Sequence, residues 1–189
     1  MTTTIEWTPK ARLILAAASD LFYAHGIHAV GVDTIAERAG VAKKTLYDRF
    51  GSKEHLVVAY LTERDQAWRD FLAERLAQVG DEPAARLAAV FASSADWAAA
   101  HSAKGCSMIN AHAEISDPAH PGYPVIMGQK RWMLDLFTTI AADTGATDPA
   151  ETGQAIMLLH EGALVTAGMG IIASAYTLAA QHAHTLIAD

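Results

Sequence analysis

Cysteine, positive charge and long apolar runs are scarce in this chain of 189 residues. The single cysteine, Cys106, cannot form an internal disulfide or build a cysteine-rich zinc site. Charged residues make up 19% of the chain and apolar residues 51%, which excludes a disordered composition and allows a sizeable core. Abundant alanine and few β-branched runs favour helices, so we expect an all-α fold.

Membrane-spanning and secretory patterns are also missing. No uncharged apolar run reaches the roughly 18 residues of a membrane span. The closest stretch, 162–175, is short and rich in glycine and alanine. Glu6 and Asp20 interrupt the apolar pattern near the beginning of the chain, which argues against a signal peptide. We therefore expect a cytoplasmic protein with no membrane partner.

The formal net charge of −7 is unevenly distributed along the chain. Residues 1–60 hold seven Lys and Arg against six Asp and Glu, whereas residues 61–189 hold seven against fifteen. An acidic protein can still bind nucleic acid where its basic groups cluster. We therefore expect two domains with different partners, at 1–55 and 56–189.

Helical periodicity and capping signals predict helices along most of the chain. Thr8 and Pro9 begin the first helix, and Gly26 ends it. Asp33 or Thr34 could cap the second helix, and Thr34 and Glu37 have the spacing of a capping box. The predicted helices lie at about 9–25, 33–39, 42–50, 52–80, 84–101, 103–116, 123–143, 149–170 and 173–187.

The segment DTIAERAGVAKKTLYDRF, residues 33–50, places two short helices on either side of a Gly-Val turn. Ala36 lies where the helices cross and permits their close approach. Gly40 supplies the sharp turn, and Val41 fills the gap beneath it. This arrangement predicts a helix-turn-helix whose second helix enters the major groove of double-stranded DNA. We assign Ile35, Val41, Leu46 and Phe50 to core packing.

Polar side chains at the beginning of that second helix suit contact with DNA. Lys43, Lys44 and Thr45 lie where such helices meet base edges and phosphates. Lysine can donate to guanine, and the threonine methyl group can pack on a thymine methyl group. Tyr47 can reach a phosphate oxygen, and Lys53 adds a cation at the start of the following helix.

Asp48 adds an acid to the same helix, and two roles for it stay open. Its carboxylate can accept from a cytosine amine, or it can orient the neighbouring Arg49. We count Arg49, and Thr34 of the preceding helix, among the candidate contacts. The predicted DNA-binding residues are Thr34, Lys43, Lys44, Thr45, Tyr47, Arg49 and Lys53.

The stretch from Gly26 to Leu56 resembles the N-terminal domain of tetracycline-repressor (TetR) type transcriptional regulators. The resemblance implies a three-helix helix-turn-helix head, joined by a long helix to a larger C-terminal helical domain that binds a ligand and dimerises. It also implies a protein without catalytic activity. The matching elements are Ile35-Ala36, Ala39-Gly40-Val41, Thr45-Leu46-Tyr47, Phe50, Lys53 and Leu56.

A second segment, residues 104–110 together with Glu114, resembles part of one branch of TetR-type ligand domains. We expect a largely apolar pocket there for a small-molecule effector whose identity is unknown, since small-molecule sites combine apolar walls with a few polar groups. Plain core packing is the alternative for each residue of this set. The candidate ligand-binding residues are Phe91, Trp97, Met108, Asn110, Trp132, Met133, Phe137 and His160.

The last two predicted helices, 149–170 and 173–187, carry many small residues beside apolar ones. In TetR-type regulators such helices form a four-helix dimer interface. The resemblance therefore implies a homodimer through these helices. A two-fold dimer suits a palindromic operator with half-sites roughly 34 Å apart. The expected function is a repressor that a ligand releases from DNA.

Two other functions are weighed against the regulator. A small helical enzyme would depend on His112, Glu114, His160 and Glu161 as acid–base residues, but no nucleophile elbow or phosphate loop accompanies them. A helical dimer that binds other proteins is the third possibility. Nine histidines are present, but none forms the i, i+4 pair of a helical zinc site, so we expect no metal and no cofactor. Cys106 is either a redox sensor or an inert buried thiol.

Overall fold

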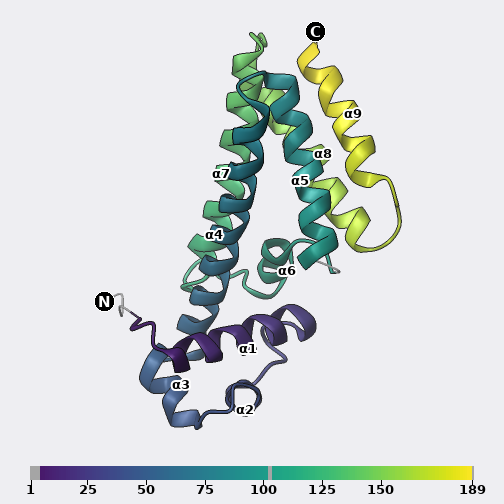
Figure 1. Cartoon of the computed structure of the whole chain (residues 1–189). Coiled ribbons are helices and arrows are strands. Elements are labelled where there is room, and N and C mark those ends of the chain that lie inside the picture. The colour runs from purple at the N-terminus through teal and green to yellow at the C-terminus, as the bar shows by residue number, and fades with distance from the viewer. Residues whose placement is uncertain (1–4, 102–103, 189) are drawn as a thin grey trace. The chain divides into compact units, whose positions relative to one another are not determined.

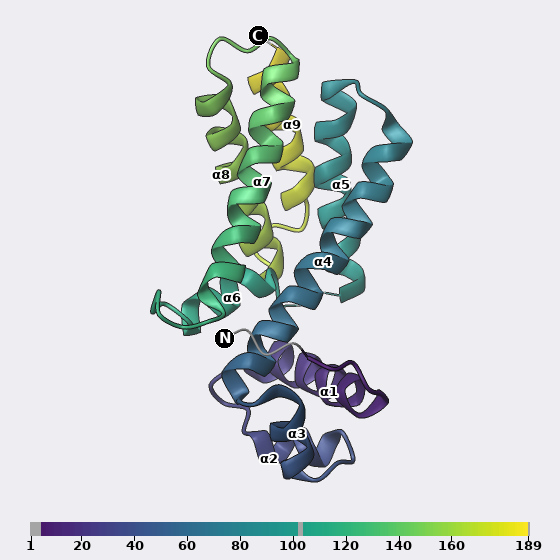
Figure 2. The same ribbon diagram turned by 90° about the vertical axis from the view of Figure 1, so that its left-hand side faces the viewer.

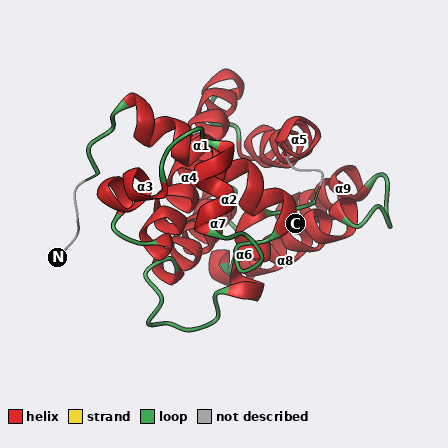
Figure 3. Cartoon of the chain, turned by 90° about the horizontal axis from the view of Figure 1, so that it is seen from below, coloured by secondary structure: helices red, strands yellow, loops and turns green. Residues whose placement is uncertain are grey.

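A computed structural model describes residues 5–101 and 104–188 of the chain. Within these ranges every regular element is a helix, and the helices are joined by loops alone (Figures 1 and 3). The predicted all-α fold is therefore confirmed. The helices are α1 (Pro9–His25), α2 (Val32–Arg38), α3 (Lys43–Phe50), α4 (Lys53–Val79), α5 (Pro83–His101), α6 (Ser107–Glu114), α7 (Tyr123–Asp143), α8 (Pro149–Gly168) and α9 (Ala175–Ala188).

Most predicted boundaries agree with these helices to within a few residues. Thr8 caps α1 as expected, because its hydroxyl accepts from the Ala11 amide at 3.2 Å. The capping box of Thr34 and Glu37 is wrong: α2 begins at Val32 after Gly31, no side chain caps it, and Thr34 lies inside the helix. The helix expected from 103 begins at Ser107 after a loop residue with positive φ, and residue 103 itself lies outside the described residues.

The chain divides into two compact units. The head unit comprises Met1–Asp65 and Ser107–Met127, so it contains α1 to α3, the first part of α4, and α6. The bundle unit comprises Gln66–Cys106 and Gly128–Asp189 and contains α5, α8, α9 and most of α7. The predicted boundary near residue 55 stays a prediction, and the inclusion of α6 in the head unit is not evident from the sequence.

In the bundle unit α9 lies along both α5 and α8 (Figures 1 and 2). Small residues permit close helix packing. A Cβ added to Gly153 of α8 would lie 2.8 Å from the Thr138 Cα of α7, and one added to Gly168 would lie 2.7 Å from the Gly105 Cα.

No helix in the described ranges is both long and apolar enough to cross a membrane. The fully or nearly buried core residues include Leu72, Leu87, Val90, Phe91, Met133, Phe137, Ile140 and Ile156.

Candidate nucleic-acid interface and effector site

The helix-turn-helix turn forms as the residue types require. Gly40 has a φ of 65°, in the region that side chains disfavour. The Val41 amide donates to the Ala36 carbonyl at 3.0 Å and closes the turn onto α2. Ala36 is buried where α2 packs, and Leu46 and Phe50 bury the inner face of α3. The turn and these apolar contacts therefore fix the orientation of α3 and the face that it exposes to solvent.

The opposite face of α3 is open to solvent. Lys43, Lys44 and Tyr47 are exposed, and Thr45 is half-buried. Because Leu46 and Phe50 occupy the core side of the same helix, the two lysines and the tyrosine project outward together. Thr34 of α2 is also exposed. The DNA contacts assigned to these residues stay predictions, and their exposure is what such contacts require.

Each of the two lysines is held by a neighbouring carboxylate. The Lys43 Nζ lies 2.9 Å from Asp33 Oδ1, and the Lys44 Nζ lies 2.8 Å from Asp48 Oδ2. The hydrogen bond to Asp33 raises the pKa of the Lys43 ammonium, so this group stays charged. DNA phosphates would have to compete with these exposed ion pairs, which are weak in water.

Arg49 and Lys53, two further predicted DNA contacts, have different neighbours from Lys43 and Lys44. The Arg49 guanidinium donates to Glu6 Oε2 at 2.7 Å. Asp48 pairs with Lys44, so the structure does not show the role of orienting Arg49 that was one of its two predicted roles. The Lys53 Nζ lies 5.9 Å from the centre of the Phe22 ring, at the first turn of α4. Free amides at that turn favour a phosphate, so a cation there is well placed for backbone contact.

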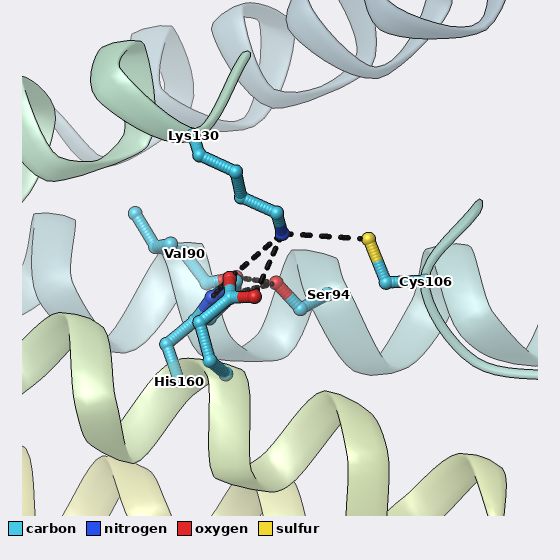
Figure 4. Close-up of polar contacts among 6 residues, drawn as sticks. Val90, Ser94, Cys106, Lys130 and His160 are labelled. Atoms are coloured by element: carbon cyan, nitrogen blue, oxygen red, sulfur yellow. Dashed lines mark hydrogen bonds and ion pairs between the residues drawn. The ribbon is translucent and has the colours of Figure 1, made fainter. Parts of the chain in front are cut away.

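A charged pair lies within the bundle unit (Figure 4). The Lys130 Nζ of α7 donates to both carboxylate oxygens of Glu161 on α8, at 2.9 and 2.8 Å, and also to the Cys106 Sγ at 3.5 Å. Burial by itself lowers the pKa of Lys130, but the neighbouring Cys106 and Glu161 outweigh it and raise that pKa. Burial likewise opposes ionisation of Glu161, but His160 and Lys130 lower its pKa overall. Both groups are therefore charged.

His160 lies beside this pair and contacts Ser94 of α5 (Figure 4). The Ser94 hydroxyl lies 2.9 Å from the Val90 carbonyl oxygen and 2.8 Å from the His160 Nε2, and the tautomer of the ring sets the direction of the second hydrogen bond. The His160 Nδ1 lies 3.5 Å from Glu161 Oε1 and makes no hydrogen bond. Burial lowers the pKa of His160, which keeps the ring neutral.

His160 lies between a serine and a carboxylate, as the histidine of a hydrolase triad does, but the geometry of Ser94, His160 and Glu161 does not support catalysis. Ser94 and His160 are each 3% exposed, so a substrate carbonyl cannot reach the hydroxyl. The distance of 3.5 Å from His160 to the carboxylate is too long for the orienting hydrogen bond. Within the described ranges, no group of three or more His, Cys, Asp or Glu residues could hold a metal ion.

The candidate effector residues fall into two groups. Phe91, Phe137 and His160 lie together, with the ring centres of the two phenylalanines 5.5 and 5.3 Å from the histidine. Met108 and Asn110 lie on α6 and belong to the head unit, and Asn110 is exposed. The structure therefore does not gather all eight candidates into one unit. The others, Trp97, Trp132 and Met133, belong to the bundle unit with Phe91, Phe137 and His160.

Sequence reasoning missed the pairing of Lys130 with Glu161 and the contact of Ser94 with His160. A signal for the first is present, because a lone carboxylate interrupts the apolar run Leu158–Val165 of α8 at Glu161. Buried charges are rare unless paired, so that carboxylate predicts a cationic partner. Which cation supplies the pair depends on tertiary packing.

Comparison with known proteins shows the same architecture elsewhere. Residues 14–60 match the family model of bacterial regulatory proteins of the tetR family. The HTH-type transcriptional activator FasR of Mycolicibacterium smegmatis is 52% identical over 48 residues, which are 25% of this chain and 22% of FasR. The HTH-type transcriptional regulator RutR of Escherichia coli is 42% identical over 59 residues, 31% of this chain and 28% of RutR. The match thus spans less than a third of these curated relatives.

Solved structures match over almost the whole chain. A TetR-family transcriptional regulator from Streptomyces coelicolor is 29% identical with a TM-score of 0.88, and the match covers 98% of both chains. A TetR-type transcriptional regulator from Streptomyces avermitilis is 31% identical with a TM-score of 0.83, covering 96% of this chain and 97% of the other. With the helix-turn-helix and the helical C-terminal part both matched, this chain belongs to the TetR family of bacterial regulatory proteins.

Proposed function

We propose that this protein is a sequence-specific DNA-binding transcriptional regulator that acts as a homodimer and is released from DNA by a small, largely apolar effector. The observation that carries the proposal is the exposed face of α3, where Lys43, Lys44 and Tyr47 project from a helix whose inner face is buried through Leu46 and Phe50. Double-helical DNA with a palindromic operator is the proposed partner.

The proposed contacts divide by role. Lys43, Lys44 and Thr45 at the beginning of α3 read base edges and nearby phosphates. Tyr47 and Lys53 contact the backbone, which fixes the register of the helix on the duplex. Thr34 and Arg49 are additional proposed contacts, with Arg49 requiring release from Glu6.

The proposed dimer uses α8 and α9. Large apolar side chains are exposed on α8 and at the residue that follows it, with Leu158 75% and Met169 69% exposed. Leu158, Gly162, Val165 and Met169 follow the i, i+4, i+7, i+11 spacing of one helix face. On α9, Leu178 and Leu186 are also exposed. A second copy of this chain is the proposed occupant of this face, because apolar patches of this kind mark interfaces.

Replacing Leu158 and Met169 with glutamate in one variant is expected to convert the dimer into a monomer, because two charges per protomer would be buried unpaired at the interface. Sedimentation equilibrium would show the mass falling from twice the 20.1-kDa chain mass to the single-chain value. Val79→Glu, which places a charge at another exposed apolar residue, is the matched control and should stay dimeric. A double variant that sediments as a dimer would contradict the interface.

The proposed effector site lies in the bundle unit around Phe91, Phe137 and His160. Aromatic rings there supply apolar walls beside one polar ring. All three side chains are buried, so an effector would reach them only by displacing side chains packed around them. An effector bound there would release DNA by favouring a dimer whose two heads no longer match the groove spacing. No specific observation favours an enzymatic function.

A mobility-shift titration tests the proposed function. The probe is a duplex from the promoter region of the protein's own gene, with a scrambled duplex of equal length as control. We expect the promoter duplex to be bound at least about 1,000-fold more tightly than the scrambled one at physiological salt, as specific regulators do. Equal affinity for both duplexes would overturn the proposal.

A further inference from the structure

The carboxylate of Glu114, the last residue of α6, holds the loop that connects α1 with α2. Glu114 Oε1 accepts from the Ile27 amide at 2.8 Å, and Oε2 accepts from the His28 amide at 2.7 Å. The His28 side chain adds its Nδ1 at 3.7 Å from Oε2. All of these residues belong to the head unit. Both oxygens of one carboxylate are thus committed to two successive backbone amides.

The geometry of the loop is built around this carboxylate. Gly26 ends α1 with a φ of 92°, which turns the next two amides outward from the helix. A Cβ added at Gly26 would lie 3.1 Å from Glu114 Oε1, so glycine also leaves room for the carboxylate. Ile27 and Val30, on either side of the turn, are buried. The loop is therefore fixed both by apolar anchors and by one charged acceptor from a distant part of the chain.

We propose that Glu114 is a positioning residue for DNA binding: its carboxylate fixes the loop 26–31 and thereby sets where α2 begins relative to α1. This inference rests on the proposed DNA-binding function. The loop leads directly into α2, whose Asp33 pairs with Lys43 at 2.9 Å. A loop freed from Glu114 would let α2 and the attached α3 change their angle to α1, which would misplace the exposed face of α3.

The test compares Glu114→Gln and Glu114→Ala with wild type. Glutamine keeps the shape and one acceptor oxygen but replaces the other with a donor that cannot accept from an amide. We expect affinity for the promoter duplex to fall about 10-fold in Glu114→Ala and by less in Glu114→Gln. The larger loss corresponds to the removal of one or two charge-assisted hydrogen bonds. Glu63→Gln, at an exposed glutamate of α4 in the same unit, is the matched control.

Amide hydrogen exchange distinguishes positioning from general stability. We expect the Ile27 and His28 amides to exchange at least about 10-fold faster in Glu114→Ala, since they lose their acceptor, while amides in the middle of α1 and α4 keep the wild-type rates. A rise across the whole head unit would overturn the positioning role in favour of a purely structural one. Affinity and exchange equal to those of Glu63→Gln would also overturn it.

The two proposals fail in different ways. If wild type shows no preference for the promoter duplex, the regulator function fails and the positioning role falls with it. If wild type prefers that duplex and both Glu114 variants bind it as tightly as Glu63→Gln does, only the role of Glu114 is lost. Weaker binding with local exchange at residues 27 and 28 supports both.

Discussion

Replacing Lys43 and Tyr47 together with alanine is expected to weaken binding to the promoter duplex about 100-fold. Both side chains are exposed on the outer face of α3, so their removal leaves the core of the head intact. A well-made contact to a base or phosphate is worth about 1–3 kcal/mol, and about 1.4 kcal/mol corresponds to tenfold in affinity. Each single variant should therefore lose roughly tenfold, as measured by fluorescence anisotropy at fixed salt.

The salt dependence and a control variant sharpen this result. If Lys43 contacts a phosphate, Lys43→Ala should reduce the slope of log affinity against log salt concentration by about one ion. Tyr47→Phe removes only the hydroxyl and should reproduce most of the loss in Tyr47→Ala if that group bonds a phosphate. Arg131→Ala, at an exposed cation of α7 in the bundle unit, should leave affinity unchanged. Unchanged affinity in the Lys43 and Tyr47 variants would refute the assignment of α3.

Lys130→Met is expected to lower the free energy of unfolding by about 2–3 kcal/mol. Breaking a buried ion pair by removing one partner costs about 3–5 kcal/mol, because the remaining charge is left uncompensated. Lys130 and Glu161 are 19% and 24% exposed, so solvent reduces this cost somewhat. Urea unfolding followed by tryptophan fluorescence reports on the bundle unit, which holds Trp68, Trp97 and Trp132. Protein concentration must be held fixed because a dimer gains stability by mass action.

A second substitution separates pairing from packing. Lys130→Met combined with Glu161→Leu removes both charges and should recover stability to within about 1 kcal/mol of wild type, since apolar replacement of a whole buried pair is often neutral. Arg131→Met, at the neighbouring exposed cation of α7, should have almost no effect. If the Lys130→Met protein is as stable as wild type, leaving the Glu161 carboxylate without its partner does not destabilise the fold.

The helix-turn-helix could be predicted from the sequence because its determinants are local. Gly40 has the positive φ that its turn requires, and Leu46 and Phe50 are buried a few residues further on, so residues close together in the sequence determine the motif. Val41, predicted to be a core residue, is only partly buried. The long α4 is equally readable, from its periodicity and from the stop at Gly80. Within the helix-turn-helix the start of α2 differs from the prediction, because Gly31 takes the N-terminal capping position and no side chain caps the helix.

The contacts that connect distant segments could not be predicted. Glu114 and Ile27 are 87 residues apart, and Ser94 and His160 are 66 apart. Periodicity shows which face of a helix is buried, but not which helix covers it. For the same reason Glu114 could be read from the sequence as an acid–base residue, whereas its carboxylate is occupied by two backbone amides. The eight effector candidates are predicted from residue type and from the resemblance of segment 104–110, neither of which shows that α6 belongs to the head unit with Met108 and Asn110.

Selection of bound duplexes from random DNA tests the central claim most directly, because it requires no knowledge of the regulated gene. Two copies of α3 related by a dimer axis should recover a palindrome with half-sites roughly one helical turn apart, and the Lys43→Ala, Tyr47→Ala double variant should recover none. Recovery of no common sequence by the wild-type protein, or of the same palindrome by the double variant, would contradict the account.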